Sequence, residues 1–414
     1  MVKRVHVVGA GLAGLSSALA LTRAGVSVAL HEAAPQAGGR CRSYFDTQLG
    51  ATIDNGNHLV LSGNRSVAAY LDEIGTRHLM HGPATSDFGF CDLATDGRFT
   101  VRLNDGPLPW WILRADRRVP GTTIADHMAL VRLLAGGNRR IDSRIRCDGA
   151  LYERFVRPVM IAALNMEPAG ASAALAAAVL RETMARGGAA CRPLVATHGL
   201  GPTFIEPALD ALRQRGATID FGHRLQSIER ENGRATRLVF NDSPIEVGDD
   251  GVVVAVPAHV ATGLLPGLDA PDEFTAILNV HFAYEPPPGT PLLLGLLNAT
   301  SEWIFAFDGR LSVTVSAADH LMSEPREALA ARIWAEVARA LHIEAPLPLW
   351  QIVKEKRATF AATPAQDARR PLVDAPALHN LVLAGDWTAT GLPATIEGAL
   401  RSGTTAANAI RALS

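Results

Sequence analysis

Near the N-terminus the chain reads Val5-His6-Val7-Val8-Gly9-Ala10-Gly11-Leu12-Ala13-Gly14, which is a mainly apolar run followed by three spaced glycines. The run predicts a buried strand over 5–8, and leucines at helical spacing predict a helix over 12–23. At such a strand-to-helix turn Gly9 permits the tight bend, Gly11 lets backbone approach a pyrophosphate, and Gly14 lets helix and strand pack closely. The helix N-terminus would face the phosphates with its unpaired N–H groups.

An acidic residue at the right distance makes this fingerprint more specific. A second strand over 26–31 ends at Glu32, placed where a carboxylate binds a ribose, and Gly38-Gly39-Arg40 follows it. A glycine-rich turn with a purely structural role would need neither feature. The first forty residues therefore predict a Rossmann-type site for flavin adenine dinucleotide, FAD.

Composition sets the wider limits. The 414 residues are 48% hydrophobic, enough for two or more domains, and the net charge of −2 argues against a nucleic-acid partner. The four cysteines lie far apart with no Cys-x-x-Cys pair, which predicts no metal site and favours a reducing cytoplasm. Lys3-Arg4 with the apolar residues after it could mimic a secretory signal, but cleavage would remove the phosphate loop, so we expect the mature chain to keep it.

No segment predicts a transmembrane helix. The longest uncharged run, 251–268, contains prolines and glycines, and it reads as a strand over 252–256, a turn at Pro257 and a short helix.

One segment, 108–160, is rich in tryptophan and arginine. Between Asp105 and Met160 there are ten arginines and six acids, and the segment includes Leu108-Pro109-Trp110-Trp111-Ile112-Leu113. Tryptophan suits a membrane interface and arginine suits anionic headgroups, so the segment predicts peripheral membrane contact. A buried aromatic cluster beside a solvated basic face is the alternative.

The far end of the chain repeats the pattern of its start. Leu381 to Ala384 predicts another buried strand, which runs into Gly385-Asp386. A carboxylate at a strand end can bind a sugar-like hydroxyl, and residues from Ala394 and Thr395 onward would open a helix toward the cofactor. The chain must therefore return to its first domain.

These motifs together resemble the flavin-dependent amine oxidase and phytoene desaturase superfamily. The segment from Gly199 to Pro257 resembles its third flavin-domain segment. The resemblance implies an α/β fold: a Rossmann-type FAD-binding domain of the glutathione-reductase and amine-oxidase kind with an inserted α+β substrate domain. Residues 1–65, 195–260 and 375–414 would form the FAD domain, and 66–194 and 261–374 the substrate domain.

The same resemblance implies roles for individual residues. Glu32 would hold the adenosine ribose, Gly11 and Arg40 the pyrophosphate, Asp386 the ribitol, and backbone near Leu225 the adenine. The candidate cofactor-binding residues are Gly9, Gly11, Leu12, Ala13, Gly14, Glu32, Gly39, Arg40, Gly56, Asn57, His58, Leu225, Gly385, Asp386, Ala394 and Thr395.

The turn Asp54-Asn55-Gly56-Asn57-His58 lies where related proteins bring a glycine-containing turn beside the flavin ring. Asparagine and glycine supply unusual backbone angles and N–H groups that could bond a flavin edge. The same residues also favour a plain turn.

Within the superfamily the chain resembles the hydroxysqualene dehydroxylase branch of bacterial hopanoid biosynthesis. The resemblance rests on Ile53 to His58, on Leu164-Asn-Met-Glu-Pro-Ala-Gly-Ala-Ser172 and on Gly385 to Gly398. It implies that the hydroxyl of hydroxysqualene leaves with a proton, as water, to give an allylic cation, and that reduced FAD adds a hydride to give squalene. NADPH would be the external reductant.

The sequence leaves the proton donor open. His58 and Asp54 are candidates by position, with Tyr44 and Tyr284 behind them and an ordered water as an alternative. An apolar substrate needs an apolar tunnel, for which residues 158–164, 169–180 and 291–297 are suited, although each could be domain core.

Three other functions share the fold. A carotenoid desaturase or isomerase would use oxidised flavin on a polyene precursor, and an amine oxidase would need an aromatic pair that the sequence does not reveal. A prenyl-lipid carrier would bind lipid without flavin, and it would not need Glu32, Arg40 or Asp386.

Overall fold

The computed structural model describes residues 3–241 and 243–413. A parallel five-stranded sheet forms one half of the molecule, in the strand order β10-β2-β1-β14-β20. Its strands are β1 (Arg4–Val8), β2 (Ser27–Glu32), β10 (Thr218–Phe221), β14 (Gly251–Val254) and β20 (Leu381–Leu383). The central strands read as continuous apolar runs because both faces of a parallel sheet are covered.

Three distant segments build this sheet. In the registers of the central strands, Val7 lies opposite Val253, and Val253 opposite Val382. Because all pairings are parallel, the carboxyl ends of the strands meet at one edge, where Gly9, Glu32 and Gly385 follow their strands. The predicted return of the chain to its first domain is present.

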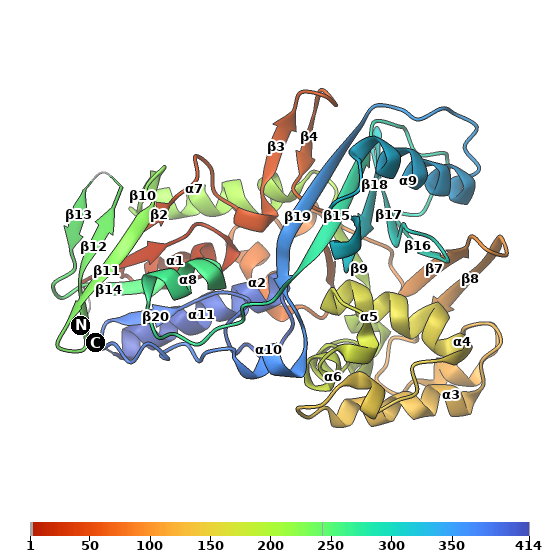
Figure 1. Cartoon of the computed structure of the whole chain (residues 1–414), viewed down its shortest axis with the longest axis horizontal. Coiled ribbons are helices and arrows are strands. Elements are labelled where there is room, and N and C mark those ends of the chain that lie inside the picture. The colour runs from red at the N-terminus through yellow and green to blue at the C-terminus, as the bar shows by residue number, and fades with distance from the viewer. Residues whose placement is uncertain (1–2, 242, 414) are drawn as a thin grey trace.

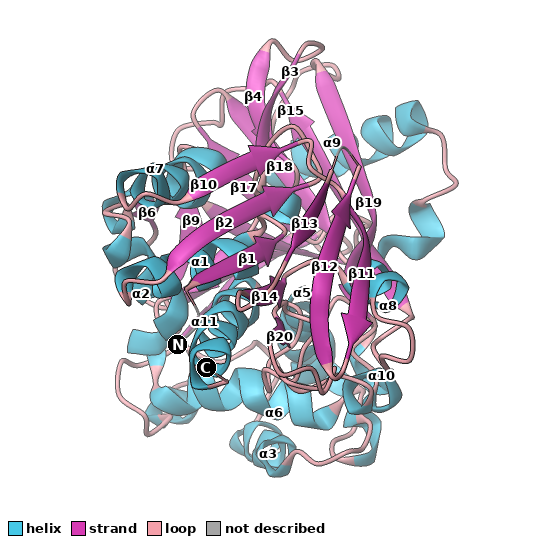
Figure 2. Ribbon diagram, turned by 90° about the vertical axis from the view of Figure 1, so that its left-hand side faces the viewer, coloured by secondary structure: helices cyan, strands magenta, loops and turns pink. Residues whose placement is uncertain are grey.

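The two faces of the sheet carry different layers (Figure 2). Val7, Val253 and Val382 pack against α1 (Leu12–Arg23), α7 (Glu206–Gln214) and α11 (Ile396–Ala412). Val252 and Val254 point to the opposite face, where they pack against β11 (Leu225–Glu231), β12 (Arg234–Phe240) and β13 (Pro244–Glu246). The period of two along each strand therefore divides one apolar run between two layers.

A second, seven-stranded sheet forms the other half of the molecule, in the order β19-β15-β18-β17-β16-β7-β8. Its strands are β7 (Asp87–Asp92), β8 (Gly97–Arg102), β15 (Phe274–Phe282), β16 (Leu293–Leu297), β17 (Trp303–Phe307), β18 (Arg310–Val315) and β19 (Trp350–Phe360). One face packs against α9 (Arg326–Leu341), and the other shares a core with a helical layer. The long strands β15 and β19 run between the two halves (Figure 1).

That helical layer contains α3 (Ile124–Ala129), α4 (Gly149–Leu151), α5 (Arg157–Leu164) and α6 (Ala173–Glu182). The remaining elements are β3 (Ser43–Asp46), β4 (Ala51–Asp54), β5 (Leu59–Leu61), β6 (Met80–His81), β9 (Pro193–Ala196), α2 (Arg65–Glu73), α8 (Ala258–Leu264) and α10 (Pro364–Ala368), with short 3-10 and π turns between them. In the described residues we find no helix long and apolar enough to cross a membrane.

The predicted elements match the structure, with small shifts at their ends. The helix over 12–23 is confirmed, whereas the strand predicted over 26–31 is 27–32 and the strand predicted over 252–256 ends at 254. The C-terminal helix starts at Ile396, not at Ala394, because Thr395 caps it.

The predicted boundary at residue 65 falls inside the packing of the first half. Val67, Tyr70 and Leu71 of α2 are buried in the same core as α1 and α11. We therefore propose that the FAD-binding domain continues through α2.

Candidate cofactor and active site

The glycine turn after β1 has the geometry that a nucleotide loop needs. Gly9 has a φ of 105°, which L side chains rarely adopt. A Cβ at Gly14 would lie 1.9 Å from the carbonyl oxygen of Gly9, so helix and strand can approach only with glycine there. A Cβ at Gly11 would meet no described atom within 4 Å outside its own turn. Protein packing therefore does not require glycine at Gly11, whereas a pyrophosphate at the N-terminus of α1 would.

The carboxylate of Glu32 is fixed at the end of β2. Its two oxygens accept hydrogen bonds from the backbone N–H groups of Ala10 (2.7 Å) and Ala34 (2.8 Å). A carboxylate has acceptor positions for about four hydrogen bonds, so two remain for ribose hydroxyls. Through Ala10, the carboxylate of Glu32 is hydrogen-bonded to the phosphate loop. Leu12 and Ala13, which follow this loop, are buried in the first turn of α1.

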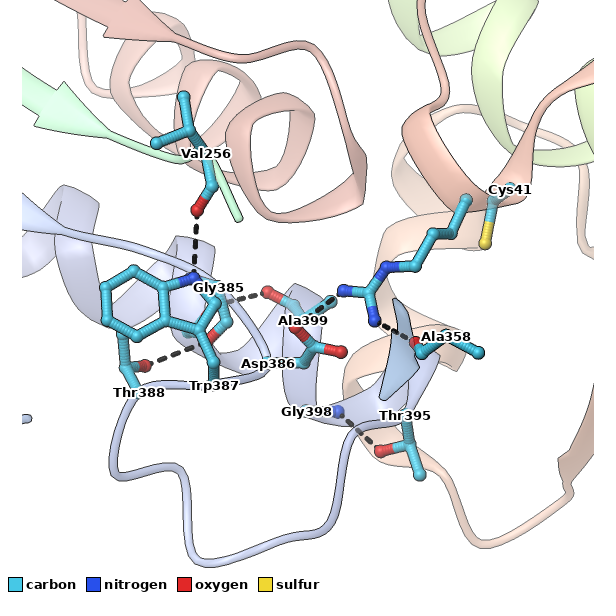
Figure 3. A network of polar contacts seen from close by, with 12 residues as sticks. Cys41, Val256, Ala358, Gly385, Asp386, Trp387, Thr388, Thr395, Gly398 and Ala399 are labelled. Atoms are coloured by element: carbon cyan, nitrogen blue, oxygen red, sulfur yellow. Dashed lines mark hydrogen bonds and ion pairs between the residues drawn. The ribbon is translucent and has the colours of Figure 1, made fainter. Parts of the chain in front are cut away.

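Arg40 connects the two ends of the chain. Its guanidinium donates to the carboxylate of Asp386 (2.7 Å) and to the carbonyl oxygen of Ala358 (2.5 Å). Figure 3 labels both acceptor residues. Burial opposes the charge on Arg40, but the adjacent Asp386 carboxylate outweighs it and raises the pKa of the guanidinium. Because 40% of the Arg40 side chain stays exposed, it can also contact an anion. Gly39, beside it, approaches Gly11 closely enough that its Cβ would lie 3.6 Å from the Gly11 Cα.

The loop after β20 is held from several sides (Figure 3). Gly385 has a φ of 150°, and a Cβ there would lie 2.3 Å from the indole nitrogen of Trp387. That nitrogen donates to the carbonyl oxygen of Val256 at 2.9 Å, and Thr388 Oγ1 donates to the Gly385 carbonyl at 2.8 Å. Asp386 is thereby presented at the carboxyl edge of the sheet, beside Arg40.

Beneath this loop lies Arg370, which the sequence did not single out. Its buried guanidinium donates to the carbonyl oxygens of Asp386 (3.1 Å) and Thr388 (2.5 Å). It also pairs with Asp367 and lies over the ring of Phe360, 4.8 Å from the centroid. Burial lowers the pKa of Arg370, with Asp367 opposing that effect. Arg370 therefore acts as a positioning residue for the loop.

The N-terminus of α11 is capped and anchored. Thr395 Oγ1 accepts from the N–H of Gly398 at 3.1 Å, and Ala394 precedes the helix. The buried carboxylate of Glu397 accepts from the N–H groups of Ser66 and Val67 at the start of α2. The sequence predicted that a helix opens near Ala394 and Thr395; Thr395 caps this helix, which begins at Ile396.

The turn after β4 contacts the second sheet. The N–H of Asn57 donates to Asn279 Oδ1 (3.2 Å), and Asn57 Nδ2 donates to Thr314 Oγ1 (3.1 Å). A Cβ at Gly56 would lie 2.9 Å from Asn279 Nδ2, so a larger residue there would have to displace the Asn279 side chain. Asn57 Oδ1 is buried with no hydrogen-bond partner in the described chain. A buried amide oxygen without a donor fits an N–H or O–H group of a bound cofactor or substrate.

Sequence reasoning also missed Asn279 and His281, although a signal was present. Both are buried polar residues of β15 that alternate with Leu278, Val280 and Phe282. The apolar residues pack toward α9, so the polar ones face the other side of the sheet. His281 donates to or accepts from Ser312 at 2.7 Å, and burial lowers its pKa to about 3.

The candidate proton donors lie in different surroundings. His58 is half-buried with Nε2 3.8 Å from Cys41 Sγ, and burial lowers its pKa, opposed by Asp54. Burial raises the pKa of the Cys41 thiol to about 12. Asp54 Oδ1 accepts from Ser43 Oγ (2.5 Å) and from the N–H of Leu200 (2.9 Å). Both predicted donors are thus close together, and Asp54 also fixes the local backbone.

The two tyrosines behind them lie elsewhere. Tyr44 is on the β3–β4 hairpin, where burial raises its pKa. The ring of Tyr284 packs 5.1 Å from that of Trp334 on α9, on the side of the second sheet opposite to Asn279. Tyr284 therefore has a packing role.

A chain of histidines lies under the predicted adenosine end. His6 Nδ1 is 3.1 Å from His31 Nε2, and His31 Nδ1 is 3.0 Å from His223 Nδ1. With Asp220 the last two could hold a metal ion, but hydrogen bonds between the rings account for the same distances. Burial, with His6 and His223, lowers the pKa of His31 to about 3. Leu225, the predicted adenine contact, follows His223 and is buried opposite Phe240.

Comparison with known proteins agrees with this geometry. A family model described as flavin containing amine oxidoreductase matches residues 12–411. A solved structure of putrescine oxidase superposes with a TM-score of 0.72 at 18% identity, covering 99% of each chain, which shows a shared fold. The fold and the site thus define a flavin-dependent oxidoreductase.

More similar sequences narrow the class. Hydroxysqualene dehydroxylase of Rhodopseudomonas palustris is 51% identical over 100% of this chain and 99% of its own, and that of Sinorhizobium fredii is 49% identical over 99% and 98%. The 15-cis-phytoene desaturase of Narcissus pseudonarcissus is 24% identical over 98% of this chain and 79% of its own. The chain belongs to the hydroxysqualene dehydroxylase family, within the flavin-containing amine oxidoreductases.

Proposed function

We propose that this protein is an FAD-dependent enzyme that reduces hydroxysqualene to squalene. The observation that carries the proposal is the full-length similarity to relatives named hydroxysqualene dehydroxylase. The alternative, a carotenoid desaturase, has only distant support at 24% identity. A lipid carrier without flavin would have no need for the Arg40–Asp386 pair or for the open position at Gly11.

The residues of the first half fit FAD, and we assign their roles as follows. The N–H groups at the start of α1 and Gly11 would bind the pyrophosphate, with Arg40 as its counter-ion. Glu32 would accept from the adenosine ribose, backbone at Leu225 would contact adenine, and Asp386 would accept from the ribitol. Gly56, Asn57 and His58 would line the flavin ring. When bound, reduced FAD supplies a hydride.

The protein must help the hydroxyl to leave. Hydroxide is a poor leaving group, so a donor has to protonate or hydrogen-bond it while the C–O bond breaks. The lowered pKa of His58 leaves it mainly neutral at pH 7, where it can pass a proton only as part of a relay. We propose that His58 and Asp54 hold the donor side of this relay, with a water as the final donor.

The substrate would lie between the second sheet and the helical layer. Met160 and Leu164 of α5 are buried in the core that contains Trp303 and Phe305 of β17. These side chains make an apolar wall, which a long hydrocarbon requires. Trp303 Nε1 is buried in this core without an acceptor in the described chain. A substrate hydroxyl would provide that acceptor.

An exposed apolar surface suits the delivery of such a substrate. Ile124, Met128 and Val131 are exposed and repeat at helical spacing along α3 and the following turn, η4 (Leu130–Ala135). The turn η3 (Trp110–Leu113), which contacts α3, adds further exposed side chains. We name this surface the apolar patch; it comprises Leu108, Trp110, Leu113, Ile124, Met128 and Val131.

The composition of the apolar patch favours a membrane surface. Six of the large apolar side chains that are exposed in the described chain gather within residues 108–131, and patches of this kind mark interaction sites. Arg117 lies over the Trp110 ring, 4.8 Å from its centroid, and so places a cation beside the patch. Trp111 is buried, so for this residue the alternative of a buried aromatic cluster agrees with the structure, whereas Trp110 is exposed. We propose peripheral contact with a membrane that carries anionic lipids.

An anaerobic single turnover tests the enzymatic proposal. The purified flavoprotein is reduced with dithionite, mixed with hydroxysqualene, and followed by flavin absorbance and product extraction. Reoxidation of the flavin with formation of squalene is expected. A flavin that stays reduced, together with oxidation of a polyene precursor by the oxidised enzyme, would instead assign a desaturase. NADPH, our proposed physiological reductant, is then tested in place of dithionite.

A further inference from the structure

A basic cavity lies beside the predicted flavin site and takes no part in the chemistry described above. Its volume is about 640 Å³, within the range of pockets that bind small molecules. It is lined by α8, by the start of β15, by β19 and by the residue after α10. The lining residues that matter here are His259, Phe274, Lys356, Arg357, Arg369 and Asp272.

The cavity has an excess of positive charge. Arg369 is paired with Asp269 and Asp272, so its charge is compensated. Lys356 and Arg357 are exposed, and neither takes part in an ion pair among the described residues. Both side chains line the cavity, so an anion with more than one negative charge could pair with two cations there.

Apolar and aromatic groups complete the lining. His259 meets the ring of Phe274 edge-on at 5.8 Å, and the guanidinium of Arg357 lies 5.9 Å from the same ring. Leu268 and Pro271 extend this wall. A charged lining of this kind would disfavour a hydrocarbon, since the cations would lose water without gaining a partner. A phosphorylated molecule with a flat ring fits both parts of the cavity.

The cavity is close to the residues that we assign to the pyrophosphate and the ribitol of FAD. Ala358, the residue after Arg357 on β19, accepts the hydrogen bond from Arg40, and Arg40 pairs with Asp386. From the other side, α8 starts just after β14, where the Val256 carbonyl holds Trp387. Burial lowers the pKa of His259, and the nearby charges of Arg357 and Arg40 lower it further. Both arginines are therefore close to the His259 side of the cavity.

We propose that this basic cavity binds the phosphates of a nicotinamide dinucleotide reductant, with Lys356 and Arg357 as the anion-binding residues. This inference rests on the proposed function, because an enzyme that adds hydride to its substrate needs a donor of two electrons. The dinucleotide gives one hydride and becomes oxidised. On the substrate one C–H bond forms and one C–O bond breaks, and the hydroxyl leaves with a proton from solvent as water.

The test measures binding of adenosine 2′,5′-bisphosphate, a phosphate-bearing half of the reductant, to the flavin-loaded protein by calorimetry. The double variant Lys356→Gln with Arg357→Gln is expected to bind it at least about ten-fold more weakly, because two charge-assisted contacts are lost. The matched control is Arg65→Gln with Arg230→Gln, two exposed arginines outside the cavity, which lowers the net charge by the same amount. The control should bind as the unmodified protein does.

Three outcomes would overturn the proposal. In the first, the double variant binds the bisphosphate as well as the unmodified protein does. In the second, the double variant loses its flavin, which would assign Lys356 and Arg357 to the flavin site. An unmodified protein that ignores the bisphosphate but accepts electrons from an acidic reductase protein would assign the charges to a protein partner. The proposed function is judged separately, by the turnover of hydroxysqualene with dithionite-reduced unmodified protein, which does not involve the cavity.

Discussion

Replacing Leu108 and Leu113 of the apolar patch with serine should weaken binding to lipid vesicles. The two side chains are 77% and 63% exposed, so most of their surface is available for burial in lipid. Because neither is part of the core, the variant is expected to keep its fold. The loss in vesicle binding therefore reports the contact with lipid and not a change in structure.

The expected magnitude follows from the exposed surface. Full burial of a leucine side chain stabilises by about 1.5–3 kcal/mol, so burial of the exposed part of both amounts to about 2–4 kcal/mol. Since 1.4 kcal/mol corresponds to a factor of ten, the partition coefficient should fall roughly 30-fold to several hundred-fold. Flotation or co-sedimentation with vesicles of phosphatidylcholine that contain about 30% anionic phosphatidylglycerol measures the partition coefficient directly.

A chemically identical control exists on this chain. Leu349 and Leu372, outside the apolar patch, are 61% and 65% exposed. Serine at these two positions removes a similar exposed apolar area. If vesicle binding depended only on the total apolar surface, both double variants would lose it equally. Equal vesicle binding of the two variants, or binding of neither the variants nor the unmodified protein, would refute the assignment of the patch to a membrane.

Three further predictions concern the cofactor site and acid stability. Gly14→Ala should abolish FAD binding and lower the melting temperature by several degrees, because the added Cβ would lie 1.9 Å from the carbonyl oxygen of Gly9. Flavin absorbance measures the loss of FAD, and thermal unfolding measures the melting temperature. Arg40→Gln should weaken FAD binding about ten-fold or more, since it removes a charged contact and leaves buried Asp386 without its partner, as measured by fluorescence titration. Burial lowers the pKa of His31 to about 3, so as pH falls from about 6.5 the unfolded state takes up a proton before the folded state does, and the free energy of unfolding decreases. By pH 5 this histidine alone accounts for a loss of about 2 kcal/mol. In urea unfolding, His31→Gln should therefore show a weaker dependence of stability on pH than the unmodified protein.

Each of these predictions has a control. Gly263→Ala introduces the same methyl group into α8, where a Cβ meets nothing within 4 Å among the described atoms, and should keep both flavin and stability. Arg42→Gln, two residues from Arg40, removes the hydrogen bond to the Gly39 carbonyl but leaves the Arg40–Asp386 pair in place, and it should retain FAD. His320→Gln, at an exposed position, should leave the pH dependence of unfolding unchanged. Equal effects in variant and control would contradict the corresponding explanation.

Local patterns were sufficient for much of the flavin half. A strand, a glycine turn and a helix can be read from adjacent residues, because the backbone angle at Gly9 and the apolar spacing of α1 are local properties. Helix ends were less accurate: the cap at Thr395 depends on one hydrogen bond to Gly398, and the sequence pattern placed the start two residues early. The boundary predicted at residue 65 leaves out α2, because α2 joins the core of the first half through contacts with α11 that no local pattern reveals.

The sequence by itself determined the class of fold and predicted which positions would face a dinucleotide, since glycine conformation, strand ends and the spacing to Glu32 act over a few residues. Only the tertiary structure decided which distant groups meet. Arg40 and Asp386 are 346 residues apart, yet their side chains form an ion pair, and Asn57 reaches Asn279 and Thr314 across the two halves. The basic cavity likewise combines α8, β15 and β19. Such contacts depend on how sheets and helices pack in three dimensions, which the spacing of residues along one segment does not specify.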